Sequence, residues 1–166
     1  MPTTHSTLPR PAAFYSARRY GAEDSVGYLM RKVTMSMAAA IDRRLESIGL
    51  TNAQWVPLLK LYLGKAVAVA ELARECEIDA GAMTRLLDRL EAKQLIRRMR
   101  SSDDRRVVNL ELTEAGRRAA ARIPGVLCEV HNAHLAGFTT AEWEALKSGL
   151  QRMLDNGAAL HRAEAG

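Results

Sequence analysis

The sequence predicts a mainly α-helical protein that carries one small β-hairpin. Three observations predict it. The 166-residue chain is 48% hydrophobic but only 5% aromatic, apolar residues recur at helical spacing along most of its length, and one short stretch alternates instead. This apolar content is enough for one domain with a substantial core.

Residues 1–23 are predicted to be a flexible arm. They hold three prolines and several arginines, and no acidic residue stands before Glu23. The prolines disfavour an amphipathic targeting helix, and the apolar core of a signal peptide is missing. No apolar run reaches the roughly 18–20 residues that a membrane helix needs, so we expect a cytoplasmic protein with no membrane partner.

A long first helix is predicted from about Asp24 to Ile48. Its apolar residues recur every three or four positions: Val26, Met30, Val33, Met37, Ile41, Leu45 and Ile48. This stripe is nearly seven turns long, more than one small domain can bury. We therefore expect a partner chain to cover the surplus.

The second helix is predicted to begin near Asn52. Thr51 and Gln54 have the spacing of a capping box, and the flanking Leu50 and Trp55 occupy the staple positions. Proline 57 falls inside this helix and removes one backbone hydrogen bond, so we expect a kink or a loosened turn there. Gly64 is expected to mark its end.

Two short helices follow and form a helix-turn-helix. The first is predicted over Val69–Cys76, and Asp79 is a good N-cap for the second. On that second helix four apolar residues share one face: Met83, Leu86, Leu87 and Leu90. The opposite face carries Gly81, Thr84, Arg85 and Asp88. Small residues beside a threonine and an arginine allow close approach to base edges in a DNA major groove.

A basic hairpin comes next along the chain. Ile96–Arg100 and Val107–Leu112 are the predicted strands, and Asp-Asp-Arg-Arg forms the tip. Between Arg85 and Arg106 eight basic residues stand against four acidic ones. A helix-turn-helix followed by such a hairpin is typical of a winged helix-turn-helix.

Two long helices are expected to close the chain. The first spans residues 114–136 and is predicted to be interrupted at Pro124. The second opens with a capping box at Thr139 and Glu142, and runs to about Leu160.

The chain resembles the MarR family of bacterial transcription regulators. The resemblance rests on Glu71-Leu-Ala, on residues 79–90, on Asp104-Arg-Arg in the wing, and on Leu110-x-Leu-Thr-x-x-Gly116. It covers roughly residues 25–160. The implied fold is a winged helix-turn-helix with long N- and C-terminal dimerisation helices and a two- to three-stranded wing.

The family's properties imply a homodimer that binds a pseudo-palindromic operator in double-stranded DNA, often as a repressor released by a small aromatic acid. Residues 24–50 and 114–162 would then be dimerisation helices intertwined with a DNA-binding region at 51–113. The resemblance assigns DNA binding to eleven residues: Asp79, Ala80, Gly81, Ala82, Thr84, Arg85, Arg89, Arg98, Asp104, Arg105 and Arg106.

Individual roles follow from the same resemblance. Thr84 and Arg85 would contact bases in the major groove, with Gly81 and Ala82 permitting close approach. In the wing, Arg106 would enter the minor groove with Asp104 orienting it, and Arg105 would meet a phosphate. An aromatic ligand would lie near four candidate residues: Tyr28, Met30, Arg31 and Trp55.

The chain departs from the family pattern in two turns. Glu77 stands where a glycine is frequent before the recognition helix, and Lys93-Gln94 stands where Lys-Gly is common after it. If either position requires a left-handed backbone, a residue other than glycine costs about 1–2 kcal/mol there.

Functions other than an effector-released DNA-binding repressor are also compatible with parts of the sequence. Cys76 lies on an apolar helix face and is expected in the core, whereas Cys128 with His131 and His134 leaves open a metal- or oxidant-responsive regulator. A regulator without an effector, or a protein–protein module whose basic hairpin meets an acidic partner, are further alternatives. No nucleophile–base set, phosphate loop or metal-ligand cluster indicates an enzyme or a cofactor.

Overall fold

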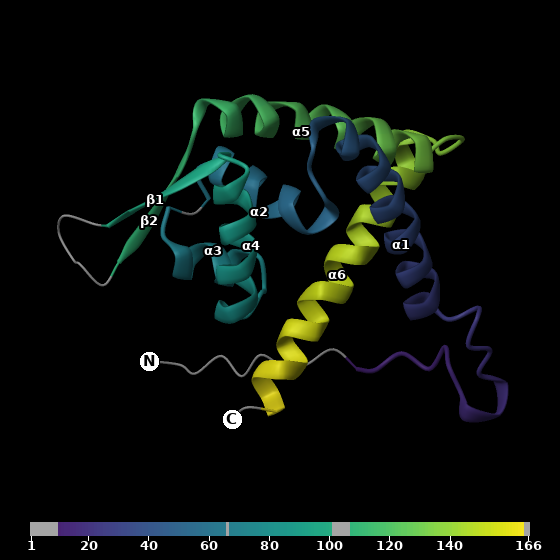
Figure 1. Cartoon of the computed structure of the whole chain (residues 1–166). Coiled ribbons are helices and arrows are strands. Elements are labelled where there is room, and N and C mark those ends of the chain that lie inside the picture. The colour runs from purple at the N-terminus through teal and green to yellow at the C-terminus, as the bar shows by residue number, and fades with distance from the viewer. Residues whose placement is uncertain (1–9, 66, 101–106, 165–166) are drawn as a thin grey trace. The chain divides into compact units, whose positions relative to one another are not determined.

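The computed structural model describes residues 10–65, 67–100 and 107–164. Their elements are, in order, η1 Ala17–Arg19, α1 Val26–Leu45, η2 Glu46–Ile48, α2 Asn52–Tyr62, α3 Val69–Glu75, α4 Ala80–Ala92, β1 Ile96–Arg100, β2 Val108–Leu112, α5 Glu114–His134 and α6 Thr140–Glu164 (Figure 1). The predicted fold class, mainly helical with one small hairpin, is confirmed. In the described part of the chain, no helix has the length and apolarity to cross a membrane.

The chain divides into two compact units. Unit 1 comprises residues 1–30 and 135–166, and unit 2 comprises residues 31–134. Unit 2 therefore holds the helix-turn-helix and the hairpin together with most of α1 and all of α5.

Unit 2 contains the hydrophobic core. Its buried apolar residues come from α1, α2, α3, α4, both strands and α5. The four apolar residues predicted on the inner face of α4 are all buried, which confirms the orientation of this helix. Figure 1 shows α5 running along one side of the group formed by α2 and α4, with the hairpin at its N-terminal end.

The junction of α1 and α2 is fixed by polar contacts. The Gln54 side chain reaches back to accept the Thr51 N–H at 3.2 Å, as the capping-box spacing predicts. Asp42 of α1 accepts the Asn52 N–H at 2.7 Å, so a side chain of one helix caps the next. Helix α2 continues through Pro57, which is buried in the core.

The hairpin is anchored at its base. Strands β1 and β2 pair antiparallel, with Ile96 opposite Leu112 and Arg100 opposite Val108. An isolated bridge joins Ala68 to Asn109. A two-stranded sheet with this extra pairing agrees with the predicted two- to three-stranded wing.

The segment Thr113–Gly116 joins the hairpin to α5 through a tight contact. The Thr113 hydroxyl donates to the Gln94 carbonyl at 2.6 Å and accepts the Gly116 N–H at 3.0 Å. A Cβ on Gly116 would lie 1.8 Å from the Leu95 carbonyl oxygen. Glycine is therefore required here by close backbone approach.

The predicted interruption at Pro124 is wrong. Helix α5 runs from Glu114 to His134 with Pro124 inside it. Proline lacks one N–H, so the loss is confined to a single backbone hydrogen bond. The buried residues Ala120, Ile123 and Val130 stand on both sides of the proline, and their packing holds the helix together across it.

Unit 1 has almost no buried surface of its own. Ser25 is its one buried residue among those the structure describes, and α6 has none. The predicted capping box at its start is confirmed, since Glu142 accepts the Thr139 N–H at 2.8 Å and its own N–H donates to the Thr139 hydroxyl at 3.3 Å. The Glu142 carboxylate also accepts the Thr139 hydroxyl at 2.8 Å. The backbone N–H and the hydroxyl of Thr139, both donating to this carboxylate, lower the pKa of Glu142.

Candidate functional site

Helix α4 presents the polar face that the sequence predicts. Asp79 caps it, because its Oδ1 accepts the Ala82 N–H at 2.9 Å. Thr84 and Arg85 are exposed on the outer side. Within the described residues the Arg85 guanidinium has no hydrogen bond or ion pair, so it is available to an external acceptor.

Gly81 leaves room at the start of this face. A Cβ there would lie 3.2 Å from Asp79 Oδ1 and 3.7 Å from Arg85 Nη1. The missing side chain thus accommodates the capping carboxylate and the guanidinium together. Thr84 bonds back along the helix, its hydroxyl donating to the Ala80 carbonyl at 2.8 Å, which leaves the hydroxyl oxygen free to accept.

Two left-handed residues bracket α4. Glu77 has φ 53° and Gln94 has φ 57°. Both departures from the glycine pattern therefore occur where glycine is favoured, and each carries the conformational cost anticipated from the sequence. The turns nevertheless have the geometry that glycine would give, so α4 begins and ends as the fold requires.

Lys93 fixes the C-terminal end of α4 through two hydrogen bonds to the α1–α2 junction. Its ammonium donates to the Gly49 carbonyl at 2.6 Å and to Gln54 Oε1 at 2.9 Å. Gln54 is buried. Lys93 is one of the eight basic residues of the basic segment, residues 85–106, and its charge is used to join α4 to the α1–α2 junction.

Arg98 braces α4 from the wing. Its guanidinium donates to Asp88 at 2.6 Å, to Glu91 at 2.9 Å and to the Thr84 carbonyl at 3.2 Å. Its side chain is only 25% exposed. The sequence assigned Arg98 to DNA, but the structure directs its charge onto two carboxylates of the recognition helix.

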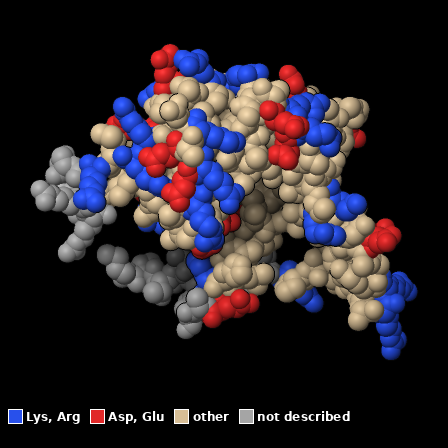
Figure 2. Space-filling view, in the orientation of Figure 1, with Lys and Arg blue, Asp and Glu red and all other residues tan. Residues whose placement is uncertain are grey.

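The basic segment is consequently less positive toward solvent than its composition indicates. Arg97 pairs with Glu111 at 2.7 Å, and Figure 2 shows Lys and Arg side chains interspersed with Asp and Glu on this face. Among the described residues Arg85, Arg89 and Arg100 are exposed and make no ion pair. These three arginines are therefore available to an external anion.

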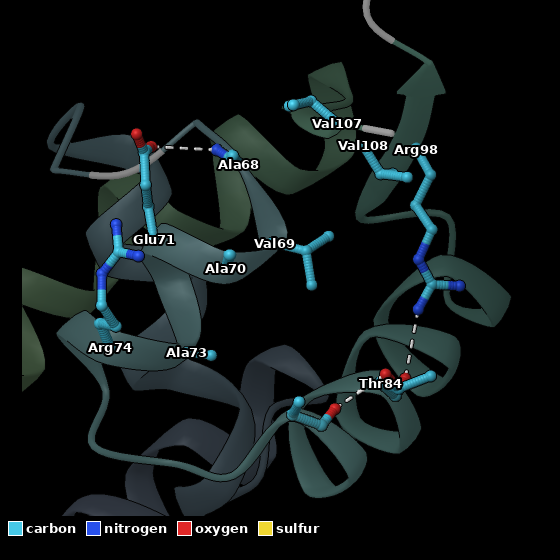
Figure 3. A pocket seen from close by; sticks show the side chains of 11 residues that line it. Ala68, Val69, Ala70, Glu71, Ala73, Arg74, Thr84, Arg98, Val107 and Val108 are labelled. Carbon is cyan, nitrogen blue, oxygen red and sulfur yellow. Dashed lines mark hydrogen bonds between the residues drawn. The ribbon is translucent and has the colours of Figure 1, made fainter. Parts of the chain in front are cut away.

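A hollow that the sequence did not indicate lies between α3, the start of α4 and the base of the wing. Its volume is about 620 Å³. Small and aliphatic side chains line most of it: Ala68, Val69, Ala70, Ala73, Ala80, Val107 and Val108. Figure 3 shows Arg98 and Thr84 on one side of this space and α3 across from them. The signal that could have indicated it is the pair Ala70 and Ala73, two small residues three positions apart on α3.

Glu71 holds the loop at the edge of this hollow. Its Oε2 accepts the N–H groups of Val67 at 3.0 Å and Ala68 at 3.1 Å. These hydrogen bonds lower the pKa of Glu71. The Val67 carbonyl in turn accepts the Leu110 N–H at 2.7 Å, so the loop is tied to β2 as well.

The remaining predicted residues are distributed as follows. Asp104, Arg105 and Arg106 lie outside the described residues. Of the ligand candidates, Tyr28 and Met30 belong to unit 1, whereas Arg31 and Trp55 belong to unit 2. The Trp55 indole donates to Asn52 at 2.9 Å, and its ring packs against the core.

The cysteines show no sensing arrangement in the described part of the chain. Cys76 packs against the core, and burial raises the pKa of its thiol. Cys128 is exposed on α5. His134 bonds to the Val130 carbonyl at 2.7 Å and to the Ser36 hydroxyl at 3.0 Å. No group of three potential metal ligands is found among the described residues.

Comparison with known proteins gives consistent matches. The model of the MarR family matches residues 50–108, which span α2 to the first residue of β2. MepR of S. aureus in complex with DNA is 26% identical, with TM-score 0.73, covering 79% of this chain and 97% of that one. A mutant of MarR from E. coli complexed with operator DNA is 26% identical, with TM-score 0.71 and coverages of 77% and 92%. A probable transcriptional regulator from Pseudomonas aeruginosa is 28% identical, with TM-score 0.69 and coverages of 79% and 98%.

Proposed function

We propose that the chain, which matches the MarR family model over residues 50–108 and resembles MarR-family structures, is a homodimeric, sequence-specific DNA-binding repressor and not an enzyme. The observation that carries the proposal is the outer face of α4. Gly81 makes room there, Thr84 is exposed, and Arg85 has no partner within the described residues. Two structurally similar regulators, MepR of S. aureus and a mutant of MarR from E. coli, have crystal structures in complex with DNA, which supports the same use of this face.

The division of labour on DNA follows from chemistry. Thr84 and Arg85 read base edges, since a bidentate arginine contact discriminates by about 1–3 kcal/mol. Arg89 and Arg100, together with Arg105 and Arg106 of the wing tip, supply the salt-dependent phosphate and groove contacts. Asp79, Ala80 and Ala82 set the close approach at the helix N-terminus.

Dimerisation is supported by the apolar surface of unit 1. Trp143, Leu146, Met153, Leu154 and Leu160 on α6 are exposed, and so are Val26, Leu29 and Met30 at the start of α1. A surface of this kind is covered by another chain in a stable protein. A dimer places its two recognition helices in successive major grooves about 34 Å apart, which matches a pseudo-palindromic operator.

Release by a small aromatic acid is the second part of the proposal. The hollow beside Thr84 and Arg98 has an aliphatic lining and lies against the DNA-reading helix. A ligand in the hollow can bind more tightly to one position of α4 relative to α3 and the wing than to another. The resulting change in DNA affinity cannot exceed this difference in ligand affinity. The earlier candidates Tyr28, Met30, Arg31 and Trp55 stay a second place to test.

The test of DNA reading is a fluorescence-anisotropy titration with an operator obtained by in vitro selection and a scrambled duplex. Wild type binds the operator selectively, Arg85→Ala loses about 5- to 150-fold in affinity, and Arg122→Ala on α5 serves as the control. Equal, weak binding of wild type to both duplexes, even after selection, would replace this function with a protein–protein role.

The effector is tested on the same assay. Benzoate-type acids are expected to weaken operator binding by wild type, and Ala70→Leu, which narrows the hollow, abolishes the response while DNA binding persists. Ala121→Leu on α5 is the matched control. If no acid alters operator affinity at saturation, the effector part is wrong. If peroxide or a chelator alters it instead, Cys128 and His131 become the candidates.

A further inference from the structure

Positive charge is concentrated in two segments of the chain. Residues 1–22 contain three arginines and no acidic residue, and residues 85–106 contain eight basic and four acidic residues. The other two stretches together hold thirteen basic and fifteen acidic residues. The two segments therefore carry more than the whole surplus of the protein, which is +5 overall, because the rest of the chain is slightly acidic.

The arm arginines are not neutralised by neighbouring side chains. Arg10, Arg18 and Arg19 are exposed, and within the described residues none of them forms an ion pair. By contrast, Arg97 and Arg98 are paired with carboxylates at 2.7 and 2.6 Å. Since no acid precedes Glu23, residues 1–22 have no carboxylate that could pair with these arginines.

The second half of the arm has a defined conformation at the start of α1. The Tyr15 hydroxyl accepts the Val26 N–H at 2.9 Å, which satisfies a free donor in the first turn of the helix. The Tyr15 and Tyr20 rings pack edge to face with centroids 5.9 Å apart. Arg18 and Arg19 lie between these tyrosines in the sequence, on the 3-10 turn η1. The tyrosine contacts therefore hold the backbone that carries the two arginines near the N-terminal end of α1.

We propose that residues 10–20 are a second DNA-binding element, which contacts the sugar–phosphate backbone in addition to the contacts made by α4. The inference rests on the proposed function. A run of unpaired arginines without acids matches a polyanion. A second copy of this chain is a poorer partner for them, because its remaining surface is only slightly acidic.

Phosphate contacts change salt dependence rather than base preference, and this defines the experiment. The variant Arg10→Gln/Arg18→Gln/Arg19→Gln is compared with wild type on the selected operator and a scrambled duplex at four salt concentrations. The control Arg43→Gln/Arg122→Gln/Arg152→Gln removes the same charge from exposed positions elsewhere.

The arm variant is expected to reduce the slope of log K against log salt by about 2 to 3 per protomer, with the preference for the operator unchanged. The control variant keeps a slope near that of wild type. A slope equal to the control's overturns the inference. So does dissociation of the arm variant to monomers in sedimentation analysis, which would make the arm a dimer contact. If wild type itself shows no operator preference, the proposed function has failed instead.

Discussion

The guanidinium of Arg98 lies 2.6 Å from the carboxylate of Asp88, and this contact joins strand β1 to the recognition helix. The same guanidinium reaches Glu91 and the Thr84 carbonyl. The wing therefore braces α4 through a side chain whose charge is already paired with carboxylates.

Arg98→Gln is expected to lower the free energy of unfolding by about 1–2 kcal/mol, because two carboxylates lose a charged partner. The slope of log K for DNA binding against log salt concentration stays at the wild-type value, since no phosphate contact is removed. Arg97→Gln, which breaks the more exposed pair with Glu111, changes stability by less than about 0.5 kcal/mol. A slope reduced by about 1 with unchanged stability would instead make Arg98 a phosphate contact.

The sequence predicted the helices and the inner face of α4 because these depend on local information. Capping residues such as Asp79 and apolar spacing act within a few positions. The internal use of Lys93 and Arg98 was not predictable in this way. Lys93 donates a hydrogen bond to Gly49, which is 44 residues away. The sequence alone does not distinguish a lysine that contacts a phosphate from one that contacts a buried amide.

Pro124 and the hollow beside α3 show a second limit of prediction from the sequence. A proline predicts a weak helix, but the tertiary packing of Ile123 and Val130 on either side of Pro124 decides the outcome. The hollow beside α3 also depends on long-range packing between α3, α4 and the wing. Composition alone does not reveal where such elements leave space.

Gly116→Ala is expected to destabilise the protein by about 3 kcal/mol, the upper end of the usual cost of overpacking. The added Cβ would collide with the Leu95 carbonyl oxygen at 1.8 Å, and both groups belong to backbone that the Thr113 hydrogen bonds hold in place. Gly125→Ala in the same helix has nothing within 4 Å of the new Cβ, so it is neutral or stabilises by up to about 1 kcal/mol. Urea denaturation of both variants measures the difference, and equal stabilities would contradict the close approach.

Gln94→Gly should increase stability. Its φ of 57° is left-handed, which costs about 1–2 kcal/mol for a residue with a Cβ, whereas glycine loses about 0.5–1 kcal/mol of unfolded-state entropy. The net gain is up to about 1.5 kcal/mol, because the carbonyl that Thr113 binds belongs to the backbone and is retained. Ala92→Gly, inside α4, is the control and loses about 1 kcal/mol. A loss of stability in Gln94→Gly would show that its side chain contributes more than the strain it carries.

Glu71 makes stability depend on pH through the loop that it holds. Its carboxylate accepts two backbone N–H groups, and these lower its pKa in the folded state. A lowered folded-state pKa stabilises the protein above the unfolded pKa, which for glutamate is about 4.3, and this stabilisation is lost as the pH falls through the folded value. Glu71→Gln therefore melts at a lower temperature than wild type at pH 7, and the gap closes below about pH 4.

Glu144→Gln on α6, whose carboxylate makes no hydrogen bond within the described residues, shows no such gap. A melting-temperature difference for Glu71→Gln that stays constant from pH 7 to pH 3 would mean that shape rather than charge secures the loop, and with it the Val67 carbonyl that pairs with Leu110 of the wing.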